Sequence, residues 1–332
     1  MNIGIRVDSS IKIGFGHIFR CLNLAKELIK YNYKVTFYCQ NLEGNLNEHL
    51  RKFFKVIEVS ADVSSLLNTL IADTELLIID SYDIDDLYEE EVIKEANCKL
   101  VVIDDINRQH NCNLLIDQNY TANEMSYPDL KSCQKLTGLS YAMLGDNFEK
   151  LHQELKVRNE FKKVLVFFGG GDISAESLKV LKAIENIKQC DKQFLIISKS
   201  LFNKKNKYTH LSNVEVLDFV EDMAKLMAES DIMFGTSGTT NWERFCTGLP
   251  AIVVSVADNQ VPNAVKLSED NLIKYLGSGF DTTSYDWENV IKKLDTESEL
   301  YKSNSVEISK LVDGKGCSRI ASKIEELLQE EN

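Results

Sequence analysis

Short runs of apolar residues alternate along the chain with segments in which apolar residues recur every three or four positions. In the first half, runs rich in β-branched residues cover residues 3–7, 34–39, 76–79, 100–103 and 114–116. Continuous apolar runs of this length are typical of parallel strands that are buried on both faces of a sheet. Between the first two runs, residues 18–29 repeat apolar residues at the spacing of one helix face. The first half therefore predicts an α/β domain.

The same alternation starts again after a charged connecting segment at residues 145–163. Predicted strands cover residues 164–168, 194–198, 214–219, 232–234 and 251–256. Predicted helices cover residues 173–187, 222–229, 239–247 and 317–329. We therefore predict two doubly wound, Rossmann-like α/β domains, residues 1–150 and 151–332, with a cleft between them. The last helix is free to pack back on the first domain.

Composition and charge narrow the class of protein. The 332 residues are 44% hydrophobic and 27% charged, which is typical of a globular protein of about two domains. The net charge of −13 argues against nonspecific binding of nucleic acid. No apolar run approaches the roughly 20 residues of a membrane span, and the first residues do not form a signal peptide. The eight cysteines show no CxxC pair, so we expect reduced thiols, no metal site and a cytoplasmic protein. We expect a monomer or weak dimer without a cofactor.

The first candidate site is the loop at residues 8–17, between the first predicted strand and helix. Gly14 and Gly16 would let the backbone turn tightly or approach a ligand. His17 would lie at the helix N-terminus, where the helix dipole disfavours the imidazolium form, so that the ring can accept a proton. The alternative is a histidine that only caps or packs against the helix. The loop is not a dinucleotide fingerprint, because the third glycine is missing.

The second candidate site is the hydroxyl-rich segment at residues 235–243, where a strand ends and a helix begins. Its small and hydroxyl-bearing residues suit a phosphate group; they are Ser237, Gly238, Thr239 and Thr240. Glu243, one turn further on, could accept hydrogen bonds from a ribose diol. The alternative is an ordinary Ser/Thr helix cap with a solvated glutamate.

Three weaker candidates also follow predicted strands. The glycine triplet containing Gly170 could admit a phosphate or sugar close to the backbone, although any tight turn can use such glycines. Asn259 and Gln260 offer neutral polar groups to a sugar, or else form a simple turn. Tyr82, after the strand that ends at Asp80, offers a hydroxyl that could orient substrate or water.

Motifs along nearly the whole chain resemble one known family. They are RVDSS (6–10), IGFGH (13–17), RCL (20–22), IDSY (79–82), VIDD (102–105), DQNY (117–120), GGGD (169–172), GTTNWER (238–244), GLP (248–250), ADNQ (257–260) and DGKG (313–316). In this order they resemble the nucleotide-sugar hydrolase family of the pseudaminic acid pathway, which acts on UDP-2,4-diacetamido-2,4,6-trideoxy-β-L-altropyranose. The chain also distantly resembles the transferase that adds N-acetylglucosamine to the lipid-linked peptidoglycan precursor, which implies a GT-B-like fold.

The resemblance implies that water attacks the anomeric carbon of a UDP-sugar with inversion, releasing UDP and a free sugar destined for pseudaminic acid and flagellin glycosylation. His17 would be the general base, with Tyr82 and Asn259 orienting sugar or water. The residues expected to contact the substrate are Gly14, Gly16, Gly170, Phe219, Val220, Ser237, Gly238, Thr239, Thr240, Glu243 and Gln260. Within that set, Phe219 and Val220 would meet the uracil and Glu243 the ribose. Ser81, where the family often has histidine, and residues 236–238 depart from the pattern and bear on the choice of sugar.

Two other functions remain open from the sequence. A glycosyltransferase of the same fold would bind the same donor and use an acceptor hydroxyl in place of water. A nucleotide-sugar-binding protein would bind UDP without turnover. The choice of sugar, with its stereochemistry and N-acyl groups, depends on the shape of the pocket.

Overall fold

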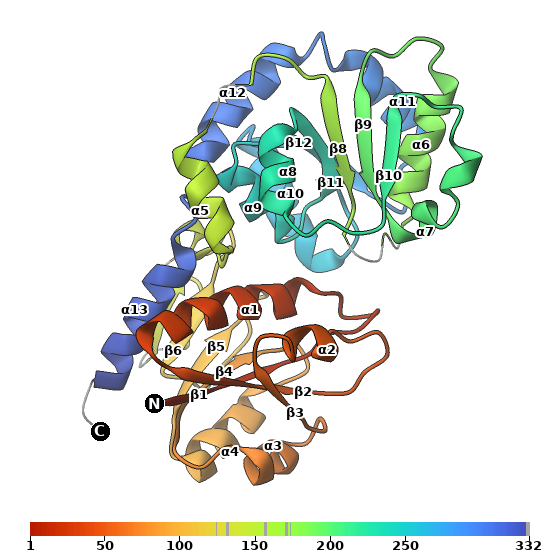
Figure 1. Cartoon of the computed structure of the whole chain (residues 1–332). Coiled ribbons are helices and arrows are strands. Elements are labelled where there is room, and N and C mark those ends of the chain that lie inside the picture. The colour runs from red at the N-terminus through yellow and green to blue at the C-terminus, as the bar shows by residue number, and fades with distance from the viewer. Residues whose placement is uncertain (124, 131–132, 156–157, 170–171, 173, 330–332) are drawn as a thin grey trace. The chain divides into compact units, whose positions relative to one another are not determined.

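The computed structural model describes residues 1–123, 125–130, 133–155, 158–169, 172 and 174–329. The chain forms two compact units, Met1–Gly145 with Lys315–Asn332, and Asp146–Gly314 (Figure 1). The sequence placed a boundary between residues 150 and 151, whereas the units divide between Gly145 and Asp146. The boundary differs because helix α5 (Asp146–Gln153), which contains the buried Phe148, contacts other helices of the second unit. The whole helix therefore belongs to the second unit.

The first unit contains a parallel sheet of seven strands in the order β3-β2-β1-β4-β5-β6-β7. The strands are β1 (Asn2–Val7), β2 (Lys34–Cys39), β3 (Lys55–Glu58), β4 (Thr74–Asp80), β5 (Lys99–Ile103), β6 (Leu114–Asp117) and β7 (Gln134–Thr137). The helices are α1 (Gly16–Leu28), α2 (Asn47–Leu50), α3 (Val63–Thr69), α4 (Asp86–Ala96) and α13 (Gly316–Gln329), with short 3-10 turns at η1 (Ile29–Tyr31) and η2 (Leu139–Tyr141). The five predicted strands are present. The edge strands β3 and β7 were not predicted, because each has only four residues and some of these are polar.

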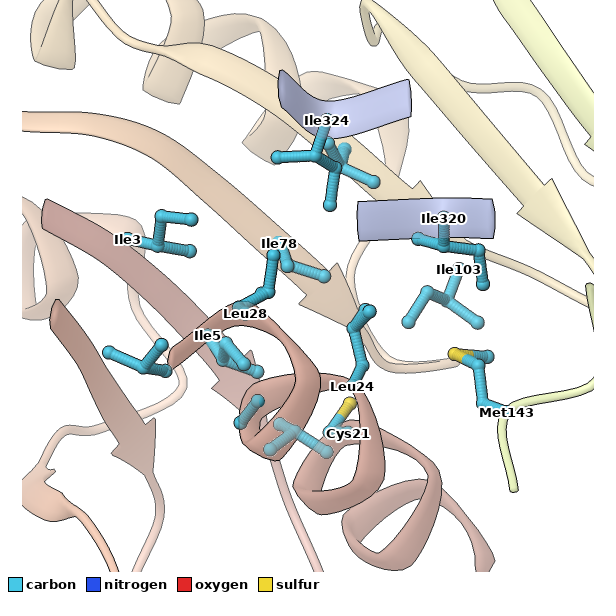
Figure 2. Close-up of a cluster of buried hydrophobic side chains, with 14 of the residues drawn as sticks. Ile3, Ile5, Cys21, Leu24, Leu28, Ile78, Ile103, Met143, Ile320 and Ile324 are labelled. Carbon is cyan, nitrogen blue, oxygen red and sulfur yellow. The ribbon is translucent and has the colours of Figure 1, made fainter. Parts of the chain in front are cut away.

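The core of the first unit lies on both faces of this sheet, because successive side chains of a strand point to opposite faces. On one face, α1 and α13 lie side by side, and Ile324 of α13 joins Ile5 and Ile78 in one apolar cluster (Figures 1 and 2). On the other face, Leu77 and Ile79 of β4 belong to a second cluster that includes residues of α3 and α4. The last helix of the chain thus completes the core begun by the first strand.

Replacing Ile324 by alanine should lower the free energy of unfolding of the first unit by roughly 2–5 kcal/mol. The side chain is fully buried in the cluster that α1, α13 and the sheet share, so its removal leaves a cavity. Chemical denaturation followed by circular dichroism measures the effect. Ile93→Ala on α4, where the side chain is 39% exposed, is the matched control and should change stability by less than about 0.5 kcal/mol. Equal effects of the two substitutions would contradict the packing described here.

The second unit contains a parallel sheet of six strands in the order β10-β9-β8-β11-β12-β13. The strands are β8 (Lys163–Phe167), β9 (Gln193–Ile197), β10 (Val214–Leu217), β11 (Ile232–Thr236), β12 (Ala251–Ser255) and β13 (Lys274–Ser278). Besides α5, the helices are α6 (Glu176–Asn186), α7 (Lys199–Phe202), α8 (Met223–Glu229), α9 (Thr240–Cys246), α10 (Val261–Glu269), α11 (Ser284–Lys293) and α12 (Ser298–Ser309), with 3-10 turns at η3 (Lys205–Lys207) and η4 (Asp258–Gln260). The sequence predicted no element in the region of β13, α10, α11 and α12. The rings of Phe234 and Trp287 lie 5.1 Å apart in a tilted pair, in the core where α6 and α11 cover one face of the sheet.

Strand order fixes where a ligand can bind in each unit. The order reverses between β1 and β4 in the first sheet, and between β8 and β11 in the second. In doubly wound sheets, ligands bind beyond the carboxyl ends of the strands at such a reversal. The loop that leads to His17 follows β1, and the hydroxyl-rich segment follows β11. Both candidate sites therefore lie at the expected position of their own sheet.

Candidate functional site

The loop between β1 and α1 is shaped by Ser10 and Gly14. The Ser10 hydroxyl oxygen accepts hydrogen bonds from the backbone N–H groups of Lys12 and Ile13, at 3.2 and 3.0 Å. The Gly14 N–H closes the turn on the Ser10 carbonyl at 2.9 Å, and Gly14 has φ +83°, a backbone conformation that favours glycine. Gly16 is the first residue of α1. His17 therefore lies in the first turn of α1, directly after this loop.

His17 is held by a carboxylate from the neighbouring strand. Its Nδ1 lies 2.6 Å from Oδ1 of Asp80, the last residue of β4, and the His17 residue is 8% exposed. An ionised carboxylate only accepts hydrogen bonds, so Nδ1 carries the proton and donates it to Asp80. In the neutral ring, Nε2 is then an acceptor, and no residue in the described part of the chain bonds to it. His17 is therefore oriented as a base whose free lone pair lies on Nε2.

Arg20 keeps Asp80 ionised. Its Nε and Nη2 donate to the two Asp80 oxygens at 2.7 and 2.6 Å, in the bidentate geometry typical of arginine–carboxylate pairs. Burial by itself would raise the pKa of Asp80, but Arg20 and then His17 outweigh burial and hold that pKa well below its usual range. Nη2 also lies 3.2 Å from Nδ1 of His17, because both donors converge on the same carboxylate oxygen.

Tyr82 packs against the ring of His17. The two rings meet edge to face with centroids 4.7 Å apart. The Tyr82 hydroxyl donates a hydrogen bond to Oδ1 of Asp105, whose other oxygen accepts from Arg20 at 2.8 Å. Burial, followed by the Asp105 carboxylate, raises the pKa of Tyr82. The phenol proton therefore stays on Tyr82, and the hydroxyl can offer a lone pair to a ligand.

In the second unit, the hydroxyl-rich segment is built on the end of β11. The Ser237 N–H donates to the Val254 carbonyl of the adjacent strand at 3.0 Å, and Ser237 is 4% exposed. Thr239, the residue before α9, makes no side-chain cap, so the alternative of an ordinary Ser/Thr cap is not what the structure contains. Within the described residues, no acceptor takes the hydroxyl protons of Ser237, Thr239 or Thr240. These hydroxyls can donate hydrogen bonds to an anionic ligand.

Glu243 is a half-buried residue in the middle of α9. No described residue donates a hydrogen bond to its carboxylate, although its neighbours in the helix at positions 241, 242 and 244 are all buried. Burial raises the pKa of Glu243 to about 7. A partly buried carboxylate to which no described residue donates a hydrogen bond is suited to receive hydrogen bonds from a ligand.

The remaining predicted site residues are placed as follows. Gln260 lies beside Gly238, since a Cβ at Gly238 would be 3.5 Å from Nε2 of Gln260. The side-chain oxygen of Gln260 accepts from the Val256 N–H at 3.0 Å. Asn259 is exposed in η4, and Phe219 and Val220 follow β10, with Phe219 64% exposed. Gly170 lies outside the described residues.

Two further properties concern cofactors and membranes. Among the residues that the structure describes, no group of three or more histidine, cysteine, aspartate or glutamate side chains is arranged to hold a metal ion, and the eight cysteines are free thiols. Within the same described ranges, no helix has both the length and the apolar character needed to cross a bilayer.

Comparison with known proteins finds a family model and several relatives that match the chain. Residues 164–315 match the glycosyltransferase family 28 C-terminal domain. The chain is 34% identical over 242 residues to the UDP-2,4-diacetamido-2,4,6-trideoxy-β-L-altropyranose hydrolase of Campylobacter jejuni, covering 70% of this chain and 83% of that protein. It is 27% identical over 273 residues to the protein MJ1062 of Methanocaldococcus jannaschii; that match covers 76% of this chain but spans only 55% of the archaeal protein.

Solved structures share the fold. The crystal structure of MurG from Acinetobacter baumannii superposes with a TM-score of 0.71 at 13% identity, covering 98% of this chain and 99% of MurG. Together with the family match of the second unit, this likeness confirms the prediction of a GT-B-like fold built from two parallel-sheet α/β domains.

Proposed function

This chain belongs to the family of the UDP-2,4-diacetamido-2,4,6-trideoxy-β-L-altropyranose hydrolase, and from that premise we propose that it hydrolyses a UDP-linked 2,4-diacetamido sugar. Water attacks the anomeric carbon, and the bond between that carbon and the diphosphate oxygen breaks. UDP and the free sugar leave, with inverted configuration at the anomeric carbon. The free sugar then supplies pseudaminic acid biosynthesis and flagellin glycosylation in the cytoplasm.

The observation that carries this proposal is the hydrogen bond from His17 to Asp80. It fixes the tautomer in which Nε2 can take a proton from water, and Asp80 stabilises the imidazolium that forms. His17 is then the general base, and Asp80 is a positioning residue that acts through it. Tyr82 would orient the water or the sugar with the lone pairs of its hydroxyl.

The leaving group requires little help from a proton donor. A nucleoside diphosphate leaves as a stabilised anion, so the paired carboxylates of ordinary glycosidases are not needed. We assign the diphosphate to the hydroxyls of Ser237, Thr239 and Thr240, and the ribose to Glu243. Asn259 and Gln260 would bind sugar polar groups, and Phe219 with Val220 the uracil.

The direct test is incubation of the purified protein with the UDP-diacetamido sugar in the absence of any acceptor. A proton NMR time course should show UDP and the free sugar appearing together, with the inverted anomer formed first. The family 28 match of residues 164–315 keeps a glycosyltransferase as the second candidate. Turnover that requires an added acceptor would favour the transferase, and UDP binding without turnover of any candidate sugar would favour a binding protein.

Nucleotide affinity should increase with pH through about 7, the pKa of Glu243 in the ligand-free protein. Ribose hydroxyls donate hydrogen bonds, so they bind the ionised carboxylate better than the protonated one. UDP binding measured by calorimetry should therefore weaken as the pH falls below 7. The terminal phosphate of UDP titrates near pH 6, so Glu243→Gln is the necessary comparison. If the variant shows the same pH dependence as the original protein, Glu243 does not bind the ribose.

A further inference from the structure

Two buried arginines of the second unit have opposite surroundings. Arg158 donates hydrogen bonds of 2.7–3.0 Å to four backbone carbonyls, those of Met227, Ser230, Thr247 and Gly248. Arg244, which is 1% exposed, directs two nitrogens at a single side-chain oxygen, Oδ1 of Asn241, at 3.0 and 2.7 Å. Its third hydrogen bond, to the Leu249 carbonyl, is 3.5 Å long. Among the described residues, no carboxylate pairs with Arg244.

The contacts of Arg244 set the direction of a short hydrogen-bond chain. A guanidinium has donors only, so the Asn241 side chain must turn its oxygen toward Arg244. The amide nitrogen of Asn241 then faces Ser237 and donates to its hydroxyl oxygen at 3.1 Å. Because that oxygen accepts from Asn241, the Ser237 hydroxyl proton is left to point elsewhere. In the described part of the chain, no acceptor receives it.

We propose that Arg244 is a positioning residue for the anionic part of the nucleotide, which acts through Asn241 to keep Ser237 a hydrogen-bond donor toward the diphosphate. This role rests on the proposed function, since it requires a phosphate at Ser237. Without the cation, Asn241 is free to reverse its amide group. Its oxygen would then accept the Ser237 proton in competition with the ligand.

The buried cation also has a consequence for stability. Burial lowers the pKa of Arg244 to about 9, which reflects a charge removed from water without an opposite charge beside it. Replacing buried ionic groups by well-packed apolar side chains of similar volume is often neutral or stabilising. Arg158 differs, because its removal would take a donor from four buried carbonyls, of which, among the described residues, only those of Gly248 and Met227 also accept from another group, the Ser305 hydroxyl and the Ser230 N–H. A functional role for Arg244 and a structural role therefore predict opposite changes in stability.

The experiment compares Arg244→Met with Arg158→Met in the full chain. Thermal unfolding is measured without ligand, and binding of UDP and of uridine is measured by calorimetry and NMR titration. For Arg244→Met we expect an unchanged or higher melting temperature and roughly 10- to 100-fold weaker UDP binding, the range for one hydrogen bond to a charged group. Uridine, which lacks phosphate, should bind as before. Arg158→Met should lower the melting temperature and leave the ratio of UDP to uridine affinity unchanged.

A double-mutant cycle with Ser237→Ala tests the route of action. If Arg244 acts through Ser237, Arg244→Met should weaken UDP binding far less in the Ser237→Ala background than in the original protein. Asn241→Asp is a second, nearly isosteric variant. Its carboxylate would pair with Arg244, which should raise stability. The same carboxylate could only accept a hydrogen bond from the Ser237 hydroxyl, so UDP binding should weaken.

Three results would overturn the inference. The first is unchanged UDP affinity in Arg244→Met, and the second is a lower melting temperature with parallel losses for UDP and uridine. The third is full additivity in the cycle. Failure of the original protein to bind UDP would contradict the proposed function itself. If the original protein binds UDP and Arg244→Met binds it equally well, the role of Arg244 fails while the proposed function stands.

Discussion

Replacing His17 by alanine should reduce hydrolysis of the UDP-sugar by roughly 10²- to 10⁴-fold, the usual contribution of a general base. The loss should fall on kcat, since the imidazole is assigned to the proton transfer and the nucleotide to the second unit. UDP release followed by NMR or a coupled assay measures the rate, and calorimetry measures UDP binding, which should be unchanged.

His210→Ala is the matched control for this substitution. The His210 side chain is 59% exposed, and its Nε2 lies 3.4 Å from the carboxylate of Glu185, a surface interaction worth little. Its removal should leave turnover unaltered. Full activity in His17→Ala would refute the assigned base, whereas loss of both turnover and UDP binding would assign the ring to nucleotide binding instead.

Replacing Asp80 by asparagine should have the second largest effect, with kcat lowered by roughly 10²- to 10⁴-fold as in other Asp–His pairs. An asparagine amide can donate to Nδ1 of His17, which would move the ring proton to Nε2 and remove the acceptor. A double variant tests whether Asp80 acts by positioning His17. In a His17→Ala background, Asp80→Asn should reduce activity little further.

Asp80→Asn also removes the charged partner of a buried arginine. Because the folded-state pKa of Asp80 is depressed, its ionisation stabilises the protein at all pH values above its unfolded-state pKa, and this contribution is lost as the pH falls through the folded-state pKa. The Asp80→Asn variant would lack this contribution at neutral pH too, although Asp105 still pairs with Arg20. Circular dichroism must therefore show that the variant is folded at the assay temperature. A folded variant with normal turnover would show that His17 needs no carboxylate partner.

The sequence predicted much of the sheet but not its edges. Runs such as residues 76–79 and 251–254 are apolar throughout, because central parallel strands are covered on both faces, and they lie in β4 and β12. β3 and β7 are the two edge strands, where one side of the strand is unpaired, and the four residues of each strand carry no such pattern. β13 contains a glycine and half-buried residues only, so it gives no strand signal either.

The site was predicted in part for a related reason. His17 and Asp80 are 63 residues apart, and only the order of strands brings them together, since β4 pairs directly with β1. The doubly wound pattern would have allowed this neighbourhood to be inferred, because the switch point always joins the loops after those two strands. Arg20 lies one turn beyond His17 on the same helix, and it donates hydrogen bonds to the same carboxylate of Asp80.

Arg244 was missed because charged residues normally face solvent. In the stretch from Trp242 to Cys246, two charged residues stand between buried apolar ones, and a seven-residue helix is too short for a clear amphipathic pattern. A sequence signal for its burial does exist. Trp242 and Phe245 are large apolar residues on the same short helix, so little exposed surface remains there for a charged side chain. Asn241, fully buried and polar, is the companion that such a residue needs.

The place of α13 determines the order in which the polypeptide can fold during its synthesis. The strands β1 to β7 emerge from the ribosome first, yet one face of their sheet lacks Ile320 and Ile324 until α13 has been translated. The unit at Asp146–Gly314 is continuous in the chain and has all of its own elements by then. The nascent amino-terminal half must therefore wait, with an apolar surface uncovered, while the part made later reaches its native state, and this interval is where chaperone binding would matter most.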